Sequence, residues 1–239
     1  MGMPVTVDVL NDKVTEEEIN GVFIYLQEID EIFSTYKVTS EIEKINRGEL
    51  KKENASKKVK EIFALCELTK KETNGYFDMY HDNKIDPSGI VKGYAIFQAA
   101  EIITQKGYKN FYVEIAGDVE VRGCNSNNKK WKIGIENPFN REEIVKIVYL
   151  SNNGIATSGT AKRSDHIYNP LTGEVADEIA SISVIGPNVY QADRFATAAF
   201  AMGEKGIEFI ERLHGFEGYM ITKNRKAVYT SQFNKYLVQ

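Results

Sequence analysis

Residues 110–150 decide the fold: NFYVEIAGDVEVRGCNSNNKKWKIGIENPFNREEIVKIVYL. Four runs in this stretch, NFYVEIAG, VEVRG, WKIGIEN and IVKIVYL, have strand character, and turns rich in Gly and Asn separate them. Such runs predict successive β-strands. Helical patterns lie on both sides of the stretch, so the order is strand, helices, many strands, helices, strands. That order favours an α+β fold over a regular βαβ alternation.

Upstream, VTVDVL at 5–10 alternates and predicts a strand, and residues 15–33 predict a helix. Thr15 and Glu18 have the spacing of a capping box. Further helices are predicted over about 56–73 and from about Lys92 to Lys106. Downstream, we expect a strand in ISVIG, an Ala-rich helix that ends at Gly203, a helix over 204–214, and two closing strands in GYMIT and KAVYTS.

The bulk composition is that of an ordinary globular protein, with 239 residues, 42% hydrophobic, 27% charged and a net charge of −4. We therefore expect one domain over residues 1–239, or alternatively two subdomains with the site between them. The charge gives no electrostatic support for non-specific nucleic-acid binding. The two cysteines lack a Cys-x-x-Cys spacing, which argues against a disulfide framework or a zinc site. No apolar run is long enough to span a membrane.

The first residues, MGMPVTVDVLNDK, lack a charged region followed by an apolar run. The sequence thus predicts a cytoplasmic protein; the alternative is an exported lipoprotein whose leader was trimmed.

The segment IDPSGIVKGY at 85–94 is the first candidate for chemistry. A turn that contains Gly leads into a helix, whose free N–H groups suit a phosphate. Lys92, expected on the first helical turn, adds a positive charge. The alternative is an ordinary helix start with a solvent-facing lysine.

The segment SNNGIATSGTAKRSDHIYNP at 151–170 is the second candidate. It looks too polar for a core strand and too rich in Gly for a helix, so we expect a loop. Thr157 and Ser158 supply hydroxyls, Gly159 allows close approach of a ligand, and His166 has the chemistry of a general base. The alternative is a plain surface loop.

Asp193 and Thr197 form the third candidate, because residues four apart share one helix face. A carboxylate and a hydroxyl on one face can hold a hard cation such as Mg²⁺. The alternative is a helix with an acidic first turn and a packing threonine. Together the three segments favour phosphoryl or nucleotidyl chemistry on a phosphorylated ligand.

Eight motifs in this order resemble the ApbE family of FAD:protein FMN transferases: MGMPVTVDV, IDEIFSTYKVTSEIEKIN, GYFD, DPSGIVKGYA, EIAGDVEVRG, IATSG, HIYNPLTG and ADRFATAAFAMG. The resemblance spans most of the chain. It implies a T-fold-like flavin transferase architecture, with mixed or antiparallel sheets and packed helices. It also implies an enzyme that uses Mg²⁺ and FAD. Such an enzyme moves the FMN half of FAD onto a Ser or Thr hydroxyl of an acceptor flavoprotein, in a motif of the Ser/Thr-Gly-Ala-Thr type, and releases AMP.

Carried over to this chain, the resemblance makes His166 the catalytic base. It implies metal ligands at Gly89, Asp193, Ala196 and Thr197. It implies FAD contacts at Met1, Tyr36, Tyr76, Phe77, Asp78, Asp86, Lys92 and Ile167, with Thr157, Ser158 and Gly159 lining the ligand.

The chain departs from the family pattern at several positions. Asn169 stands where the family has Asp, which keeps hydrogen-bonding capacity but loses the charge. Ala116 replaces the first Gly of Gly-Gly-Asp, and Phe97 replaces an Asp. Only MYHDNK separates GYFD from IDPSG, so the chain is a compact variant. Two alternatives stay open: an FAD pyrophosphatase that gives FMN and AMP, and a non-catalytic FAD-binding protein.

Overall fold

The structure is a computed structural model that describes residues 2–160 and 167–238. Its strands are β1 Val5–Val9, β2 Tyr80–His81, β3 Lys84–Ile85, β4 Phe111–Ile115, β5 Asp118–Arg122, β6 Trp131–Asn137, β7 Asn140–Leu150, β8 Asn153–Gly159, β9 Ile179–Gly186, β10 Glu217–Thr222 and β11 Ala227–Tyr229. Its α-helices are α1 Glu16–Phe33, α2 Glu41–Asn46, α3 Lys57–Glu72, α4 Ser88–Gln105, α5 Val189–Ala201 and α6 Gly206–Glu211.

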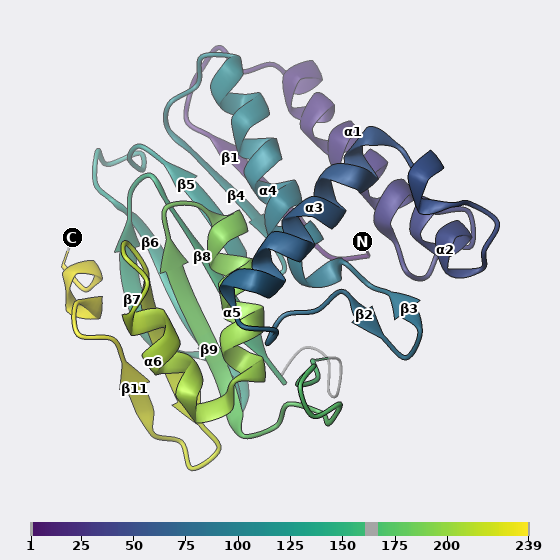
Figure 1. Cartoon of the computed structure of the whole chain (residues 1–239). Helices are drawn as coiled ribbons and strands as arrows, with labels where there is room; N and C mark the ends of the chain where they lie inside the picture. Colours follow the sequence, from purple (N-terminus) through teal and green to yellow (C-terminus); the bar gives the residue numbers. More distant parts are fainter. Residues whose placement is uncertain (1, 161–166, 239) are drawn as a thin grey trace.

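Seven strands form one sheet in the order β1-β4-β5-β8-β9-β10-β11, and every neighbouring pair is antiparallel (Figure 1). Residues 110–150 supply β4 and β5 to this sheet and then leave it as a separate hairpin, β6–β7. The α+β prediction is confirmed.

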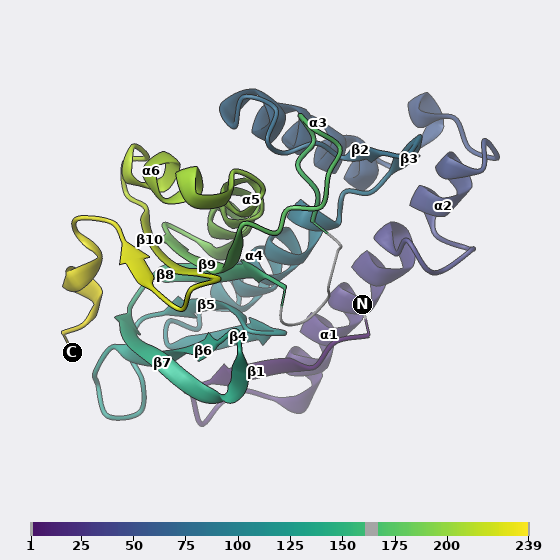
Figure 2. The same cartoon turned by 90° about the horizontal axis from the view of Figure 1, so that it is seen from below.

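The large sheet separates two apolar cores. Helices α4, α5 and α6 lie on one face, and the β6–β7 hairpin lies on the other (Figure 2). Because both faces are covered, all eight residues of β9 are buried. Along β8 the side chains alternate between the two faces of the sheet. Ala156 belongs to the core on the side of the helices (the helical core), and Ile155 belongs to the core on the side of the β6–β7 hairpin (the hairpin core). The sheet therefore presents one face, and only one, to α4 and α5.

Several predicted helices are confirmed at their capping residues. The Thr15 hydroxyl accepts the N–H of Glu18, and the Glu18 carboxylate accepts the N–H of Thr15, which completes the capping box of α1. The Ser56 hydroxyl accepts the N–H of Val59 and caps α3. The Ala-rich helix is α5, which begins at Val189, with Asn188 as its cap.

Two local predictions are wrong. Helix α4 begins at Ser88 instead of about Lys92, so Lys92 lies on its second turn and not its first. Residues 153–159, which look too polar for a core strand, form β8 between β5 and β9 in the middle of the sheet. Their polar groups find partners on the neighbouring strands, as described below.

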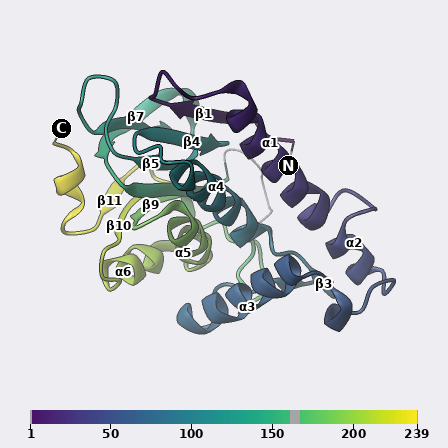
Figure 3. The same ribbon diagram turned by 90° about the horizontal axis from the view of Figure 1, so that it is seen from above.

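The sequence does not predict α2 or the β2–β3 hairpin. The Ser40 hydroxyl caps α2 by accepting the N–H of Glu43. The turn of the hairpin places Asp82 and Asn83 at φ values of 48° and 60°, which suits the two-residue turn of a hairpin. Helices α1, α2 and α3 and strand β3 form the end of the molecule away from the C-terminus (Figure 3).

Among the described residues, no helix is both long enough and apolar enough to cross a membrane.

Candidate functional site

Lys92, Asp118 and Asp193 meet where α4, β5 and α5 come together. The Nζ atom of Lys92 lies 2.5 Å from Oδ2 of Asp118 and 3.8 Å from Oδ1 of Asp193. Both aspartates are almost fully buried, whereas Lys92 is partly exposed. Burial raises the pKa of Asp193 to about 7; the charge of Lys92 opposes this rise and the nearby charge of Asp118 adds to it. Lys92 is therefore the cation that allows two carboxylates to share this interior.

Gly93 allows α4 to approach α5 at this point. Its N–H donates to Oδ2 of Asp193 at 2.7 Å. A Cβ on Gly93 would lie 2.6 Å from Cβ of Asp193 and 2.9 Å from the carbonyl oxygen of Val189, distances that real Cβ atoms do not adopt. The glycine thus fixes the position of the Asp193 carboxylate.

The predicted metal ligands lie along the same α4–α5 interface. The Thr197 hydroxyl, one turn after Asp193, donates to the carbonyl oxygen of Gly89 at 3.4 Å. A Cβ on Gly89 would lie 3.0 Å from Phe77 and 3.1 Å from Thr197, so any larger residue here would press on both side chains.

Carboxylate, hydroxyl and carbonyl oxygens are the donors that Mg²⁺ prefers, so these residues fit such an ion. The carbonyl of Ala196 lies inside α5, where the helical hydrogen bond occupies one of its lone pairs. Within residues 2–160 and 167–238, no group of three or more His, Cys, Asp or Glu side chains forms a metal cluster. A cation here would rely on Asp193 and neutral oxygens.

Strand β8 carries the predicted lining residues. The N–H of Thr157 donates to Oδ1 of Asp118 at 3.0 Å, and the Thr157 hydroxyl shares a 2.7 Å hydrogen bond with the hydroxyl of Ser183. By strand alternation the Thr157 side chain points away from the helical face, whereas Ser158 points toward it. A Cβ on Gly159 would lie 2.9 Å from the carbonyl oxygen of Ala180, so this end of β8 is closely packed.

The run Tyr76–Asp78 leads from α3 to the β2–β3 hairpin. Phe77 is buried, and its N–H donates to the hydroxyl of Thr73. Oδ2 of Asp78 lies 2.6 Å from Nζ of Lys70, and its Oδ1 accepts the N–H of Tyr80. The N–H of Asp86 donates to the carbonyl of Met79, and Oδ1 of Asp86 accepts the N–H of Ser88 at the start of α4. Asp86 therefore ties the hairpin to the helix that carries Lys92.

Four predicted site residues remain: Tyr36, Ile167, Met1 and His166. Tyr36, after α1, is 76% exposed. Ile167 is half-buried against the helical core, and its carbonyl accepts the N–H of Ala176. Met1 and His166 lie outside the described residues.

Asp118 has a role in the cluster that sequence reasoning did not assign to it. The motif EIAGDVEVRG contains this residue, so the family pattern marked its position but not its contact with Lys92.

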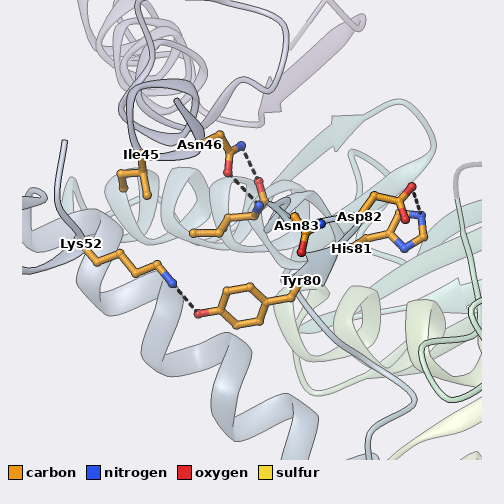
Figure 4. A pocket seen from close by; sticks show the side chains of 8 residues that line it. Ile45, Asn46, Lys52, Tyr80, His81, Asp82 and Asn83 are labelled. Carbon is orange, nitrogen blue, oxygen red and sulfur yellow. Dashed lines mark hydrogen bonds and ion pairs between the residues drawn. The ribbon is translucent and has the colours of Figure 1, made fainter. Parts of the chain in front are cut away.

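A cavity of about 530 Å³ lies beside the β2–β3 hairpin, lined by Ile45, Asn46, Lys52, Tyr80, His81, Asp82, Asn83 and Ile85 (Figure 4). Nζ of Lys52 lies 3.1 Å from the Tyr80 hydroxyl. The Asn46 side chain donates to the carbonyl of Ile85 and accepts its N–H. None of the predicted site residues lines this cavity.

Comparison with known proteins identifies the family. The family model described as ApbE family matches residues 1–82 and 79–220. The chain is 31% identical over 167 residues to the FAD:protein FMN transferase of Klebsiella pneumoniae. This match covers 64% of this chain and 48% of that protein. It is 35% identical over 140 residues to the protein of the same name in Haemophilus influenzae, covering 54% and 40%. The chain thus spans about half the length of the curated relatives it matches.

Solved structures show the same fold over nearly the whole chain. A structure of flavin transferase ApbE from Vibrio cholerae has a TM-score of 0.85 and 21% identity, covering 99% of this chain and 96% of that one. The ApbE protein from Thermotoga maritima has a TM-score of 0.85 and 22% identity, covering 100% and 97%. With the family model matching most of its length and the motif residues Lys92 and Asp193 meeting in the fold, the chain belongs to the ApbE family.

Proposed function

We propose that this chain is an Mg²⁺-dependent FAD:protein FMN transferase. It would transfer the FMN moiety of FAD to a Ser or Thr hydroxyl of an acceptor flavoprotein, form a phosphoester and release AMP. The relatives named FAD:protein FMN transferase support the class of reaction. The observation that carries the proposal is the meeting of Lys92, Asp118 and Asp193, which come from three distant motifs, where α4, β5 and α5 come together.

The residues of this interface suit a pyrophosphate. Lys92 is partly exposed, so its ammonium group can contact a ligand and still remain paired with Asp118. A bound Mg²⁺, held by Asp193, Thr197 and the carbonyls of Gly89 and Ala196, would polarise the phosphoryl oxygens and neutralise their charge. The positive charge of Lys92 acts in the same direction on the leaving AMP.

The acceptor hydroxyl requires a base, because a Ser or Thr hydroxyl is a weak nucleophile at neutral pH. We assign this role to His166, from the motif HIYNPLTG. The imidazole would take the hydroxyl proton as the new phosphoester bond forms and the bond to AMP breaks. We assign binding of FAD to Tyr36, the run Tyr76–Asp78, Asp86 and Ile167.

The test is incubation of the protein with FAD, Mg²⁺ and a peptide that carries a Ser/Thr-Gly-Ala-Thr acceptor. Peptide that becomes covalently fluorescent, with AMP released in equal amount, is the expected result. Free FMN and AMP without labelled peptide would replace the proposal with an FAD pyrophosphatase. Bound FAD without either product would make the chain an FAD-binding protein.

A further inference from the structure

Tyr168 attaches the segment 167–176 to the β2–β3 hairpin. Its hydroxyl lies 3.1 Å from the carbonyl oxygen of Asp78 and 3.1 Å from that of Tyr80, so its single proton is shared between the two acceptors. Its ring stacks on the imidazole of His81, with centroids 3.6 Å apart and an angle of 20° between the planes. Burial raises the pKa of Tyr168, so its hydroxyl stays protonated as a donor. The contact joins segments that are far apart in the sequence, which lie side by side in Figure 2.

The segment that carries Tyr168 has its own internal order. Tyr168 forms an antiparallel bridge with Val175. The N–H of Asn169 donates to the carbonyl of Glu174 at 2.8 Å, and its side-chain oxygen accepts the N–H of Leu171. These hydrogen bonds make 167–176 a small unit whose position is set by where it is attached.

Leu171 places this unit beside the other end of the same run. A Cβ on Gly75, the residue before Tyr76, would lie 3.2 Å from Cδ2 of Leu171. The unit therefore lies beside the chain just before Tyr76, at Leu171, and is hydrogen-bonded to Asp78 through Tyr168. It brackets the run Tyr76–Asp78.

We propose that Tyr168, with His81 as its stacking partner, is a positioning residue that sets the spacing between Ile167 and the run Tyr76–Asp78 in the flavin-nucleotide site. The inference rests on the proposed function, since it takes those residues as FAD contacts. Tyr168 itself contacts backbone carbonyls and an imidazole, so it acts through its neighbours. Two of its partners, Tyr80 and His81, form strand β2 of the hairpin, and the third, Asp78, lies two residues before that strand.

A purely structural role makes a different prediction. If the contact only stabilised the fold, its loss would lower the Tm and leave the affinity of the folded protein for FAD unchanged. A positioning role moves the Kd and KM for FAD, while kcat at saturating FAD changes little, because the energy of FAD binding realigns the two contacts. Where FAD binding must restore the order that this hydrogen bond supplies, its loss of about 1 kcal/mol weakens the affinity for FAD about fivefold.

The experiment compares Tyr168→Phe, which removes the hydroxyl and keeps the ring, with His81→Ala and His81→Phe. Tyr112→Phe is the matched control: it also removes a part-buried hydroxyl that donates a hydrogen bond, to Glu114, in strand β4. The measurements are the Kd for FAD from the change in flavin fluorescence without acceptor, KM and kcat for FAD with acceptor peptide, and the Tm.

We expect Tyr168→Phe and His81→Ala each to raise the Kd and KM for FAD about fivefold with kcat changed less than twofold. We expect His81→Phe, which restores a flat ring, to recover most of the affinity, and Tyr112→Phe to leave it unchanged. An unchanged Kd for Tyr168→Phe, or an equal change in Tyr112→Phe, overturns the inference. A wild-type protein that binds FAD but transfers nothing overturns the proposed function alone, because the Kd values still decide the role of Tyr168. A wild-type protein that does not bind FAD overturns both.

Discussion

Gly93→Ala tests whether the contact between α4 and α5 depends on a missing side chain. The added methyl carbon would lie 2.6 Å from Cβ of Asp193, 2.9 Å from its Oδ2 and 2.9 Å from the carbonyl oxygen of Val189. One of these atoms is backbone, and the others belong to a buried carboxylate with little room to move. The two helices must therefore separate, or Asp193 must leave its hydrogen bond with the N–H of Gly93.

The net cost follows from two opposing effects. Overpacking costs about 1–3 kcal/mol, and three contacts below 3.0 Å place this site near the upper end. Replacing Gly with Ala inside a helix returns about 1 kcal/mol. We expect a net loss of about 2 kcal/mol in the free energy of unfolding, which for a chain of this size lowers the Tm by about 4–8 °C.

Gly21→Ala is the matched control for this measurement. Gly21 lies inside α1, and a Cβ there would have no atom within 4 Å apart from its own stretch of helix. The same substitution should therefore stabilise the protein by about 1 kcal/mol and raise the Tm by about 2–4 °C. Thermal unfolding followed by circular dichroism measures both variants. A Gly93→Ala protein that melts at or above the wild-type Tm would refute the close approach of the two helices.

Three further predictions concern single side chains. His166→Ala should abolish transfer while FAD still binds, since the acceptor hydroxyl loses its base; peptide labelling at the wild-type rate would remove His166 from that role. Asp193→Ala should remove Mg²⁺ dependence together with activity, and normal turnover by this variant would refute the metal site. Burial raises the pKa of Glu120 from 4.5 to about 7, so its protonated form favours folding and this contribution is lost as pH rises through that range. The Tm of Glu120→Gln relative to wild type should therefore rise between about pH 4.5 and 7 and stay level above it; a constant difference would show that Glu120 ionises normally.

Local signals predicted the elements whose causes are local. The capping box of Thr15 and Glu18 marked the start of α1 because both partners lie within one turn. The start of α4 differs from the prediction because Pro87 stands at the cap position and makes no side-chain hydrogen bond, whereas the carboxylate that accepts the N–H of Ser88 belongs to Asp86, one residue earlier. Because the helix begins four residues earlier than predicted, Lys92 lies on its second turn.

Strand β8 could not be predicted because its polar groups are satisfied across strands. The hydroxyl of Thr157 pairs with Ser183 of β9, and its N–H pairs with Asp118 of β5. A sequence window shows only that the residues are polar, not that partners will meet them. The same limit hid the link between Tyr168 and the hairpin. The resemblance to the ApbE family implied one site for Lys92 and Asp193, and these two residues lie at one interface in the fold.

The large sheet also has a practical consequence, since it isolates one side of the molecule from the other. The turn between β6 and β7, at Pro138 and Phe139, belongs to the face opposite α4 and α5, and Phe139 is 42% exposed. A peptide tag inserted between these two residues offers a handle for surface immobilisation. A protein tethered there would face the solution with the side that holds Lys92 and Asp193.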